Sequence, residues 1–246
     1  MIKKAIKIFV NAMFSPFGYK IDKRELDGKA EGFPGYLDEA IKLGMDVNDY
    51  EEQKLGWDEA LPILEQTTFP YLREDSIVCE IGVGTGRWSR HIIKKIANGE
   101  LHLVDHSLWM VEFLKKYFAS NPRIYVHLCD SLSLPFKKDD WVDMVFSAGT
   151  FIEFKLGLFL LYGKEFYRVL KPGGYCIIEY IDISSSEGWD HFIKHSSDYG
   201  GACYEYHTRE TIEKAFNYIG FKIKKNIQIG RSIFLIAKKP EKYFIS

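Results

Sequence analysis

Apolar positions follow two different periods along the last two thirds of the chain. From residue 76 onward, short apolar runs of strand length are separated by longer segments with apolar residues at helical spacing. The runs predict strands over 77–81, 100–104, 124–129, 143–147 and 174–180, and the segments between them predict helices over 86–97, 109–119 and 159–170. Strands that alternate with helices form parallel sheets covered on both faces. We therefore expect a doubly wound α/β domain.

The pattern changes after Tyr206 to one helix followed by two strands. A helix over 208–219 has Thr208 as its predicted N-cap and Gly220 as its C-cap. Apolar strands are predicted over 221–227 and 231–237, on either side of a three-residue connection. So short a connection can join only antiparallel strands. The predicted sheet is thus mostly parallel, has seven strands and ends in an antiparallel hairpin.

The first 73 residues lack this alternation and predict a helical arm or cap, placed before a main domain over 74–246. Residues 49–71 have helical spacing but contain Pro62, which predicts two helices or a kink. Met1–Phe14 combines lysines with apolar positions on one helical face. Such a helix either docks on its own domain or makes weak contact with an anionic membrane surface.

Composition narrows the class of partner. The 33 Lys and Arg residues balance 34 Asp and Glu residues, for a formal net charge of −1. This balance argues against a nucleic-acid partner, because proteins that bind phosphate backbones carry a basic surplus. No apolar run reaches the length of a membrane span. The four cysteines, Cys79, Cys129, Cys176 and Cys203, lack metal-ligand spacing, so we expect free thiols, no metal site and a cytoplasmic location.

A glycine-rich loop follows the first predicted strand. Residues 77–86 read IVCEIGVGTG, with Glu80 before Gly82, Gly84 and Gly86. Glycines let the backbone pass close to a ligand, and the helix that follows presents free N–H groups. The dinucleotide fingerprint G-x-G-x-x-G requires glycine at position 87, where this chain has arginine. A nicotinamide oxidoreductase is therefore disfavoured.

The loop with Glu80 resembles the first motif of the class I S-adenosylmethionine-dependent methyltransferases. Later segments resemble further motifs of that family in the same order, namely 102–105, 128–136, 141–147, 168–174 and 217–221. The resemblance covers residues 74 to about 238. It implies a Rossmann-like domain that binds S-adenosyl-L-methionine.

The resemblance also implies roles for individual residues. Asp105, at the end of the second predicted strand, is expected to accept hydrogen bonds from both ribose hydroxyls. Asp130, with the backbone of Ser131 and Leu132, is expected to bind the adenine amino group, and His106 to stack on the adenine. The full predicted donor set is Glu80, Gly82, Gly84, Gly86, Asp105, His106, Asp130, Ser131, Leu132 and Ser147. The alternatives are a purely structural glycine turn, a helix-capping Asp105 and a loop-capping Asp130.

The acceptor side is predicted from residues outside the motifs. Residues 184–206 are rich in histidines, acids and aromatics and show no clear periodicity, so we expect a loop. We expect residues 189–206 to form a lid or wall over the acceptor, opposite the N-terminal cap. His191 and His195 are the candidate general bases, since a neutral imidazole suits that role near pH 7. The alternative base is Glu153, after the fourth predicted strand.

The predicted activity is O-methylation of a small-molecule or sugar hydroxyl. Ser147–Thr150 lacks the Asn/Asp-Pro-Pro that adenine N-methyltransferases carry after the fourth strand, which disfavours base methylation. Residues 15–20 resemble the start of some methyltransferases of bacterial surface-polysaccharide assembly, which favours a sugar acceptor. The alternatives are a protein or lipid-like acceptor and a non-catalytic S-adenosylmethionine-binding or scaffold subunit.

Overall fold

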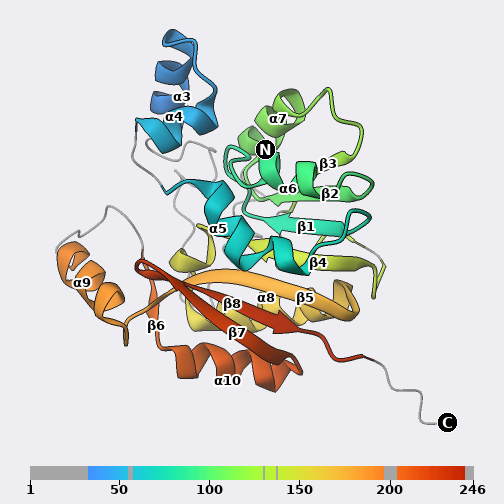
Figure 1. Cartoon of the computed structure of the whole chain (residues 1–246), viewed down its shortest axis with the longest axis vertical. Helices are drawn as coiled ribbons and strands as arrows, with labels where there is room; N and C mark the ends of the chain where they lie inside the picture. The colour runs from blue at the N-terminus through green and yellow to red at the C-terminus, as the bar shows by residue number, and fades with distance from the viewer. Residues whose placement is uncertain (1–32, 55–57, 130, 137, 197–203, 242–246) are drawn as a thin grey trace, which may run out of the picture.

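The computed structural model describes the chain except residues 1–32, 55–57, 130, 137, 197–203 and 242–246 (Figure 1). Its centre is one sheet with the strand order β3-β2-β1-β4-β5-β8-β7. The strands are β1 (Ile77–Ile81), β2 (Glu100–Asp105), β3 (Ile124–Leu128), β4 (Val142–Ser147), β5 (Leu170–Asp182), β6 (Tyr206–His207), β7 (Lys222–Ile229) and β8 (Ser232–Lys238). Strands β1 to β5 are mutually parallel, and β8 pairs antiparallel with both β5 and β7.

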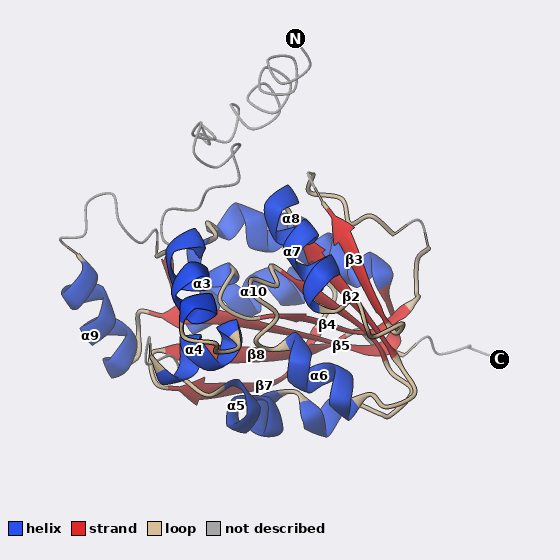
Figure 2. Cartoon of the chain, turned by 90° about the horizontal axis from the view of Figure 1, so that it is seen from above, coloured by secondary structure: helices blue, strands red, loops and turns tan. Residues whose placement is uncertain are grey.

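Helices cover both faces of the sheet (Figure 2). On one face, α5 (Ala60–Thr67), α6 (Ser89–Lys95) and α7 (Leu108–Tyr117) bury apolar residues against β1 and β2. On the other face, α8 (Leu156–Val169) and α10 (Arg209–Ile219) do the same with fully buried Phe159, Phe166 and Phe216. The central strands are therefore buried on both sides, which is why they read as continuous apolar runs.

The predicted doubly wound sheet and its C-terminal hairpin are confirmed. Thr208 caps α10 by accepting from the Thr211 N–H, and Gly220 ends it with φ of 114°. The predicted seven-strand count is corrected by one short strand, because β6 pairs with the end of β5 off the main path. Strand β5 also begins four residues before the predicted start, directly after α8.

The segment from Ser186 to His195 is a helix, α9, so its prediction as a loop was wrong. Ser185 caps it by accepting from the Gly188 N–H at 3.0 Å. Trp189 and Ile193, four residues apart, are half exposed on this helix. Figure 1 shows α9 at the left of the sheet, on the side where the parallel strands end.

In the described part of the chain before the main sheet, α3 (Phe33–Lys42) and α4 (Val47–Gln53) come first. Their buried residues Ala40, Val47 and Tyr50 form a small cluster with Phe113 and Tyr117 of α7. Helix α5, by contrast, belongs to the main core. The two helices predicted over 49–71 are confirmed as α4 and α5. The break between them lies before α5 and not at Pro62. Pro62 lies in the first turn of α5, where a missing N–H is tolerated. The division at residue 73 stays a prediction, and Met1–Phe14 lies outside the described residues.

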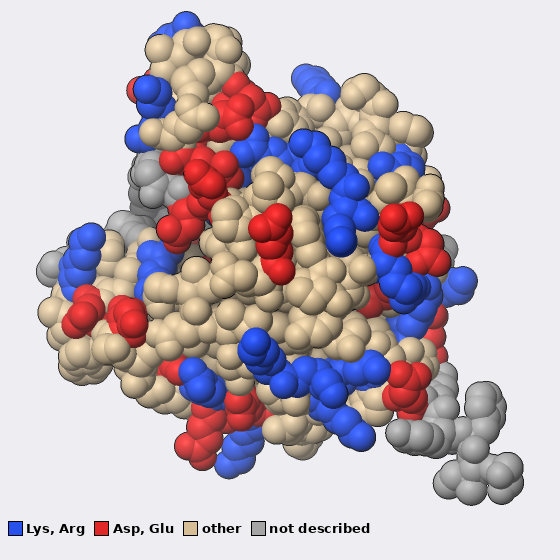
Figure 3. All heavy atoms as spheres, viewed as in Figure 1, with Lys and Arg blue, Asp and Glu red and all other residues tan. Residues whose placement is uncertain are grey.

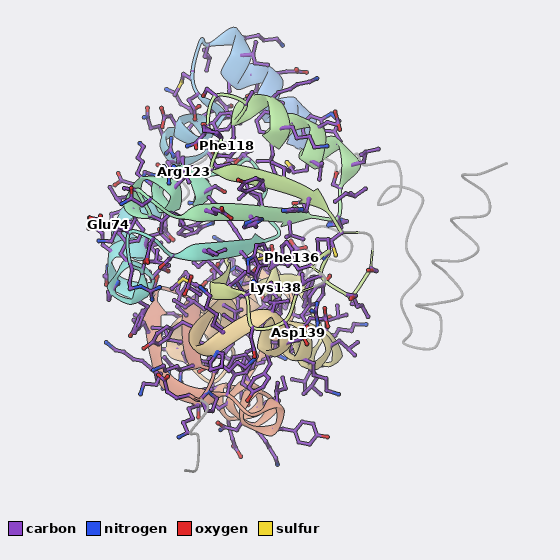
Figure 4. The ribbon with its side chains drawn as sticks, turned by 90° about the vertical axis from the view of Figure 1, so that its right-hand side faces the viewer. Glu74, Phe118, Arg123, Phe136, Lys138 and Asp139 are labelled. Atoms are coloured by element: carbon purple, nitrogen blue, oxygen red, sulfur yellow. The ribbon has the colours of Figure 1, made fainter. Side chains whose placement is uncertain are left out.

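The segments through which the chain enters the parallel strands contain several of the residues labelled in Figure 4. Glu74, Arg123 and Asp139 come from the segments before β1, β3 and β4. Arg123 donates to the carbonyls of Ile93 and Gly99 at 3.3 and 3.2 Å, which fixes the end of α6 against β3.

Across the described residues, no helix is long and apolar enough to cross a membrane. Cys79, Cys129 and Cys176 are buried free thiols, and Cys203 lies outside the described part.

Candidate active site

The glycine loop lies where β1 ends, between β2 and β4. Gly82, Gly84 and Gly86 have φ of 67°, 59° and 90°, a region that only glycine adopts at little cost. A Cβ on Gly82 would lie 2.0 Å from Thr150 Oγ1, and one on Gly86 would lie 2.7 Å from the Phe118 ring. A Cβ on Gly84 would meet nothing within 4 Å. Gly82 and Gly86 therefore allow close packing, whereas Gly84 faces open space.

Asp105 ends β2 beside this open space. The residue is 7% exposed, and Oδ1 accepts from the Ser107 N–H at 2.8 Å. Burial raises the pKa of Asp105. Hydrogen bonds from the backbone of Ser107, Gly84 and Val83 lower that pKa and offset part of this effect. Ser107, not Asp105, is the N-cap of α7. Asp105 thus supports the turn before α7 and also has a second carboxylate oxygen next to the glycine loop. His106 beside it is exposed.

Glu80 lies inside β1 under the loop. Its Oε2 accepts from the Ser89 hydroxyl at 2.7 Å, while its Oε1 is buried without a hydrogen-bond partner among the described residues. Burial raises the pKa of Glu80 to about 8. A buried acceptor without a donor is costly in free energy, so it indicates a missing polar or cationic ligand.

The other predicted donor residues have different positions. Ser147, fully buried at the end of β4, donates to the Ile81 carbonyl at 2.8 Å and so ties β4 to the start of the glycine loop. The Ser131 hydroxyl donates to the Ser133 carbonyl, and Leu132 is half-buried. Asp130 lies outside the described residues. Their donor-binding roles stay predictions.

Helix α4 packs on the glycine loop, a contact that the sequence did not reveal. Glu51 is fully buried, and its two carboxylate oxygens lie 2.9 and 2.8 Å from the Thr85 hydroxyl. Asn48 donates to the Tyr117 hydroxyl at 2.9 Å, and Arg90 of α6 pairs with Glu52 at 2.9 Å. Figure 3 shows acidic and basic side chains side by side where α4 meets the rest of the molecule. The only sequence signal was a run of acids in a helical segment.

A cavity of about 510 Å³ opens on the β4 and β5 side of the glycine loop. Residues from distant segments line it, namely Asp58, Ile63, Arg87, Trp88, Gly149, Ile152, Glu153, Glu179, Tyr204, Ile229, Arg231, Ser232 and Phe234. Glu179 of β5 accepts from the Gly149 N–H at 2.7 Å and from the Ser232 hydroxyl. The prediction missed Glu179, although a carboxylate inside an apolar strand is a readable signal.

Glu153 belongs to the short 3₁₀ helix η3 (Phe151–Glu153), which follows β4. Its side chain lines the cavity, and burial raises its pKa, while the charge of His106 lowers it. The backbone N–H of Glu205 donates to the Ile152 carbonyl at 2.8 Å. This bond brings Tyr204 to the cavity next to η3, and Tyr204 is the residue of the described part of 189–206 that lines it. The predicted lid or wall over the acceptor stays a prediction.

His191 and His195 lie on α9, with ring centroids 4.3 Å apart. His191 Nε2 lies 2.6 Å from Arg231, and Nδ1 lies 2.9 Å from the Tyr206 hydroxyl. Burial and the charge of Arg231 lower the pKa of His191 to about 4, so the ring is neutral at pH 7. Because arginine only donates, Nε2 accepts and Nδ1 carries the proton. Both nitrogens of His191 are thus engaged. The role of either histidine as base stays a prediction.

Comparison with known proteins gives consistent matches. Residues 78–174 match a family model described as a methyltransferase domain. An uncharacterized methyltransferase-like protein of Schizosaccharomyces pombe is 33% identical over 130 residues, which are 52% of this chain and 47% of that protein. A malonyl-[acyl-carrier protein] O-methyltransferase of a Marinomonas species is 31% identical over 123 residues, 48% of this chain and 44% of the relative. These matches span a little under half of each curated relative.

Among solved structures, a SAM-dependent methyltransferase from Aquifex aeolicus aligns with a TM-score of 0.60 and 19% identity. The alignment covers 82% of this chain and 97% of that one. At this identity the likeness concerns the fold, which extends well beyond the residues matched by the family model.

Proposed function

Because residues 78–174 form a methyltransferase domain of the class I, S-adenosylmethionine-dependent family, we propose that this chain transfers a methyl group from S-adenosylmethionine to an oxygen of a small hydroxylated molecule. The observation that carries the proposal is the cavity of about 510 Å³ beside the glycine loop, which contains Glu153. Cavities of roughly 300–1,000 Å³ hold small ligands.

The donor fits the residues around the glycine loop. The open space at Gly84 leaves room for it, and Asp105 offers a carboxylate oxygen to the ribose hydroxyls. The unpartnered Oε1 of Glu80 suits the positive charge of the methionine part. When bound, S-adenosylmethionine supplies a methyl group already activated by its sulfonium. The task left to the chain is to orient an acceptor and take its proton.

Glu153 is the base that we propose for that proton. It lines the cavity, it has no hydrogen-bond partner among the described residues, and its raised pKa makes it a stronger base than an ordinary glutamate. The O-methyltransferase named among the relatives agrees with oxygen as the atom methylated. A sugar hydroxyl remains our first choice of acceptor, because sugars combine many hydroxyls with small size.

The test separates the donor from the acceptor. Asp105→Ala should weaken binding of S-adenosylhomocysteine in calorimetry by about 1.5–3 kcal/mol, the value of a hydrogen bond to a charged group. Glu153→Gln should lower methyl transfer from labelled S-adenosylmethionine to a panel of sugars by about 10²–10⁴-fold, with donor affinity unchanged.

Glu112→Gln is the matched control, since Glu112 is exposed on α7 and pairs only with Lys115 among the described residues. Donor binding without transfer to any small hydroxylated acceptor would favour a protein or lipid-like acceptor, or a non-catalytic subunit. An Asp105→Ala protein that binds the donor as tightly as the parent would contradict the donor site.

A further inference from the structure

Two charged side chains in the cavity, Arg231 and Glu153, are not held in ion pairs with any described residue. Arg231 lies directly before β8, and Glu153 lies on η3. Arg231 is half-buried, and a cation that is partly withdrawn from water without an anionic partner is costly in free energy, so it suggests a ligand that carries an anionic group.

Arg231 is held in place by neutral aromatic groups. Its Nη1 donates to His191 Nε2 at 2.6 Å, and its guanidinium lies 5.1 Å from the centroid of the Tyr204 ring. Neither partner cancels the positive charge, and the guanidinium has five N–H donors in a planar fork. Donors therefore remain for a second, anionic partner in the cavity.

The other charged side chains that line the cavity, Arg87, Asp58 and Glu179, lie close to one another. Arg87 donates to the Asp58 carbonyl, stacks 4.5 Å from the Trp88 ring centroid and has Glu51, Glu52, Glu179 and Asp58 near it. Glu179 accepts from the Gly149 N–H and from the Ser232 hydroxyl. Tyr204 lies close to both Arg231 and Glu153. The Arg231 guanidinium lies over its ring, and the neighbouring Glu205 N–H donates to the Ile152 carbonyl in η3.

We propose that Arg231 binds an anionic group of the acceptor, a carboxylate or a phosphate, while Glu153 receives the hydroxyl that is methylated. The acceptor is thus a hydroxylated anion of the sugar-acid or sugar-phosphate type. This inference rests on the proposed function and names its substrate class. His191 then acts as a positioning residue: it accepts from Arg231, donates to Tyr206 and fixes the direction of the guanidinium.

The experiment compares three sugars that differ in charge. Glucuronate, glucose 6-phosphate and glucose are titrated by calorimetry into the full chain saturated with S-adenosylhomocysteine. At least one anionic sugar should bind ten times more tightly than glucose, and the two anions show whether carboxylate or phosphate is preferred. Arg231→Gln should abolish the difference, and the salt dependence of binding should fall with it.

Lys224→Gln is the control, since Lys224 is exposed on β7 and the substitution removes the same charge. His191→Gln keeps an acceptor for Arg231 and should retain the anion preference, whereas His191→Leu should lose most of it. A merely structural role of His191 would affect thermal stability in both variants without altering the preference.

Equal binding of glucose and the two anions, or no binding of either anion, would overturn the inference. A preference that survives in Arg231→Gln would do the same. Donor titration of the same samples keeps the two proposals apart. If S-adenosylhomocysteine binds and the anions do not, only the inference is lost; if the donor does not bind, the proposed function itself is lost.

Discussion

The three glycines of the loop are required for different physical reasons, although they share one motif. At Gly82 and Gly86 a Cβ would collide with Thr150 and Phe118, while at Gly84 it would meet nothing within 4 Å. The sequence motif identifies all three glycines, but it does not show which of them are needed for packing and which leaves room for a ligand. That distinction depends on side chains 32 to 68 positions away in the chain.

Gly84→Ala and Gly86→Ala should therefore fail in different ways. Both place a side chain at positive φ, which costs about 1–2 kcal/mol. Gly84→Ala should fold but bind S-adenosylhomocysteine at least tenfold more weakly, because its methyl group enters the space that we assign to the donor. Gly86→Ala should lose a further 1–3 kcal/mol or so of stability from overpacking against Phe118. Thermal unfolding and calorimetry on both variants check this. Undiminished donor affinity in Gly84→Ala would place the donor elsewhere.

At the scale of elements, α4 is the piece that the sequence did not position. Its helical spacing was readable, but its contacts with Thr85, Arg90 and Tyr117 join positions 34 to 71 residues apart. Elements with local signals were placed more accurately, as the Thr208 cap and Gly220 of α10 illustrate. In α9 the spacing of Trp189, Phe192 and Ile193 is helical, yet only three apolar residues carry it among polar ones, so composition suggested a loop.

The docking of α4 on the glycine loop predicts energetic coupling between Glu51 and Thr85. In a double-mutant cycle of Glu51→Ala and Thr85→Val, the two changes should be non-additive by about 1–3 kcal/mol, because each removes the same buried hydrogen bond. Urea unfolding of the parent, both single variants and the double variant gives this energy. Donor affinity should fall in both single variants, since the loop loses its support.

Additivity within about 0.5 kcal/mol would contradict the docking of α4. As a matched cycle, Glu112→Ala with Lys115→Ala tests an exposed pair on α7 and should give about 0.5 kcal/mol or less.

For the whole molecule, the alternation of strands and helices was enough to predict the sheet, its parallel direction and the terminal hairpin. These features follow from hydrophobic periodicity and short connections, both of which are local. The acceptor cavity was not predictable in this way. Arg231 meets His191 across 40 positions, and Glu179 meets Ser232 across 53, and no periodicity records such pairs.

The outer strands β2 and β3 carry a histidine pair that links global stability to pH. His102 Nδ1 lies 3.0 Å from His127 Nε2, and His102 Nε2 lies 3.3 Å from Glu100. Rings of Phe136 and Trp141 pack edge-on against His102. Burial, and then the charge of His102, lower the pKa of His127 to about 4, and burial also lowers the pKa of His102. The folded chain therefore keeps both rings neutral under conditions in which the unfolded chain protonates them.

Since the pKa of His127 is about 4 in the folded chain and 6.5 ordinarily, the unfolded state binds an extra proton between these values. The free energy of unfolding should thus be highest above pH 6.5 and should fall as the pH drops towards 4. His127 should account for about 1 kcal/mol between pH 7 and pH 5, after allowance for its partial exposure to solvent. His127→Phe keeps an aromatic ring against Phe136 and cannot titrate, so its urea midpoint should depend less on pH in this window. If the two proteins lose stability in parallel from pH 7 to pH 5, the histidine pair is not the source of the dependence.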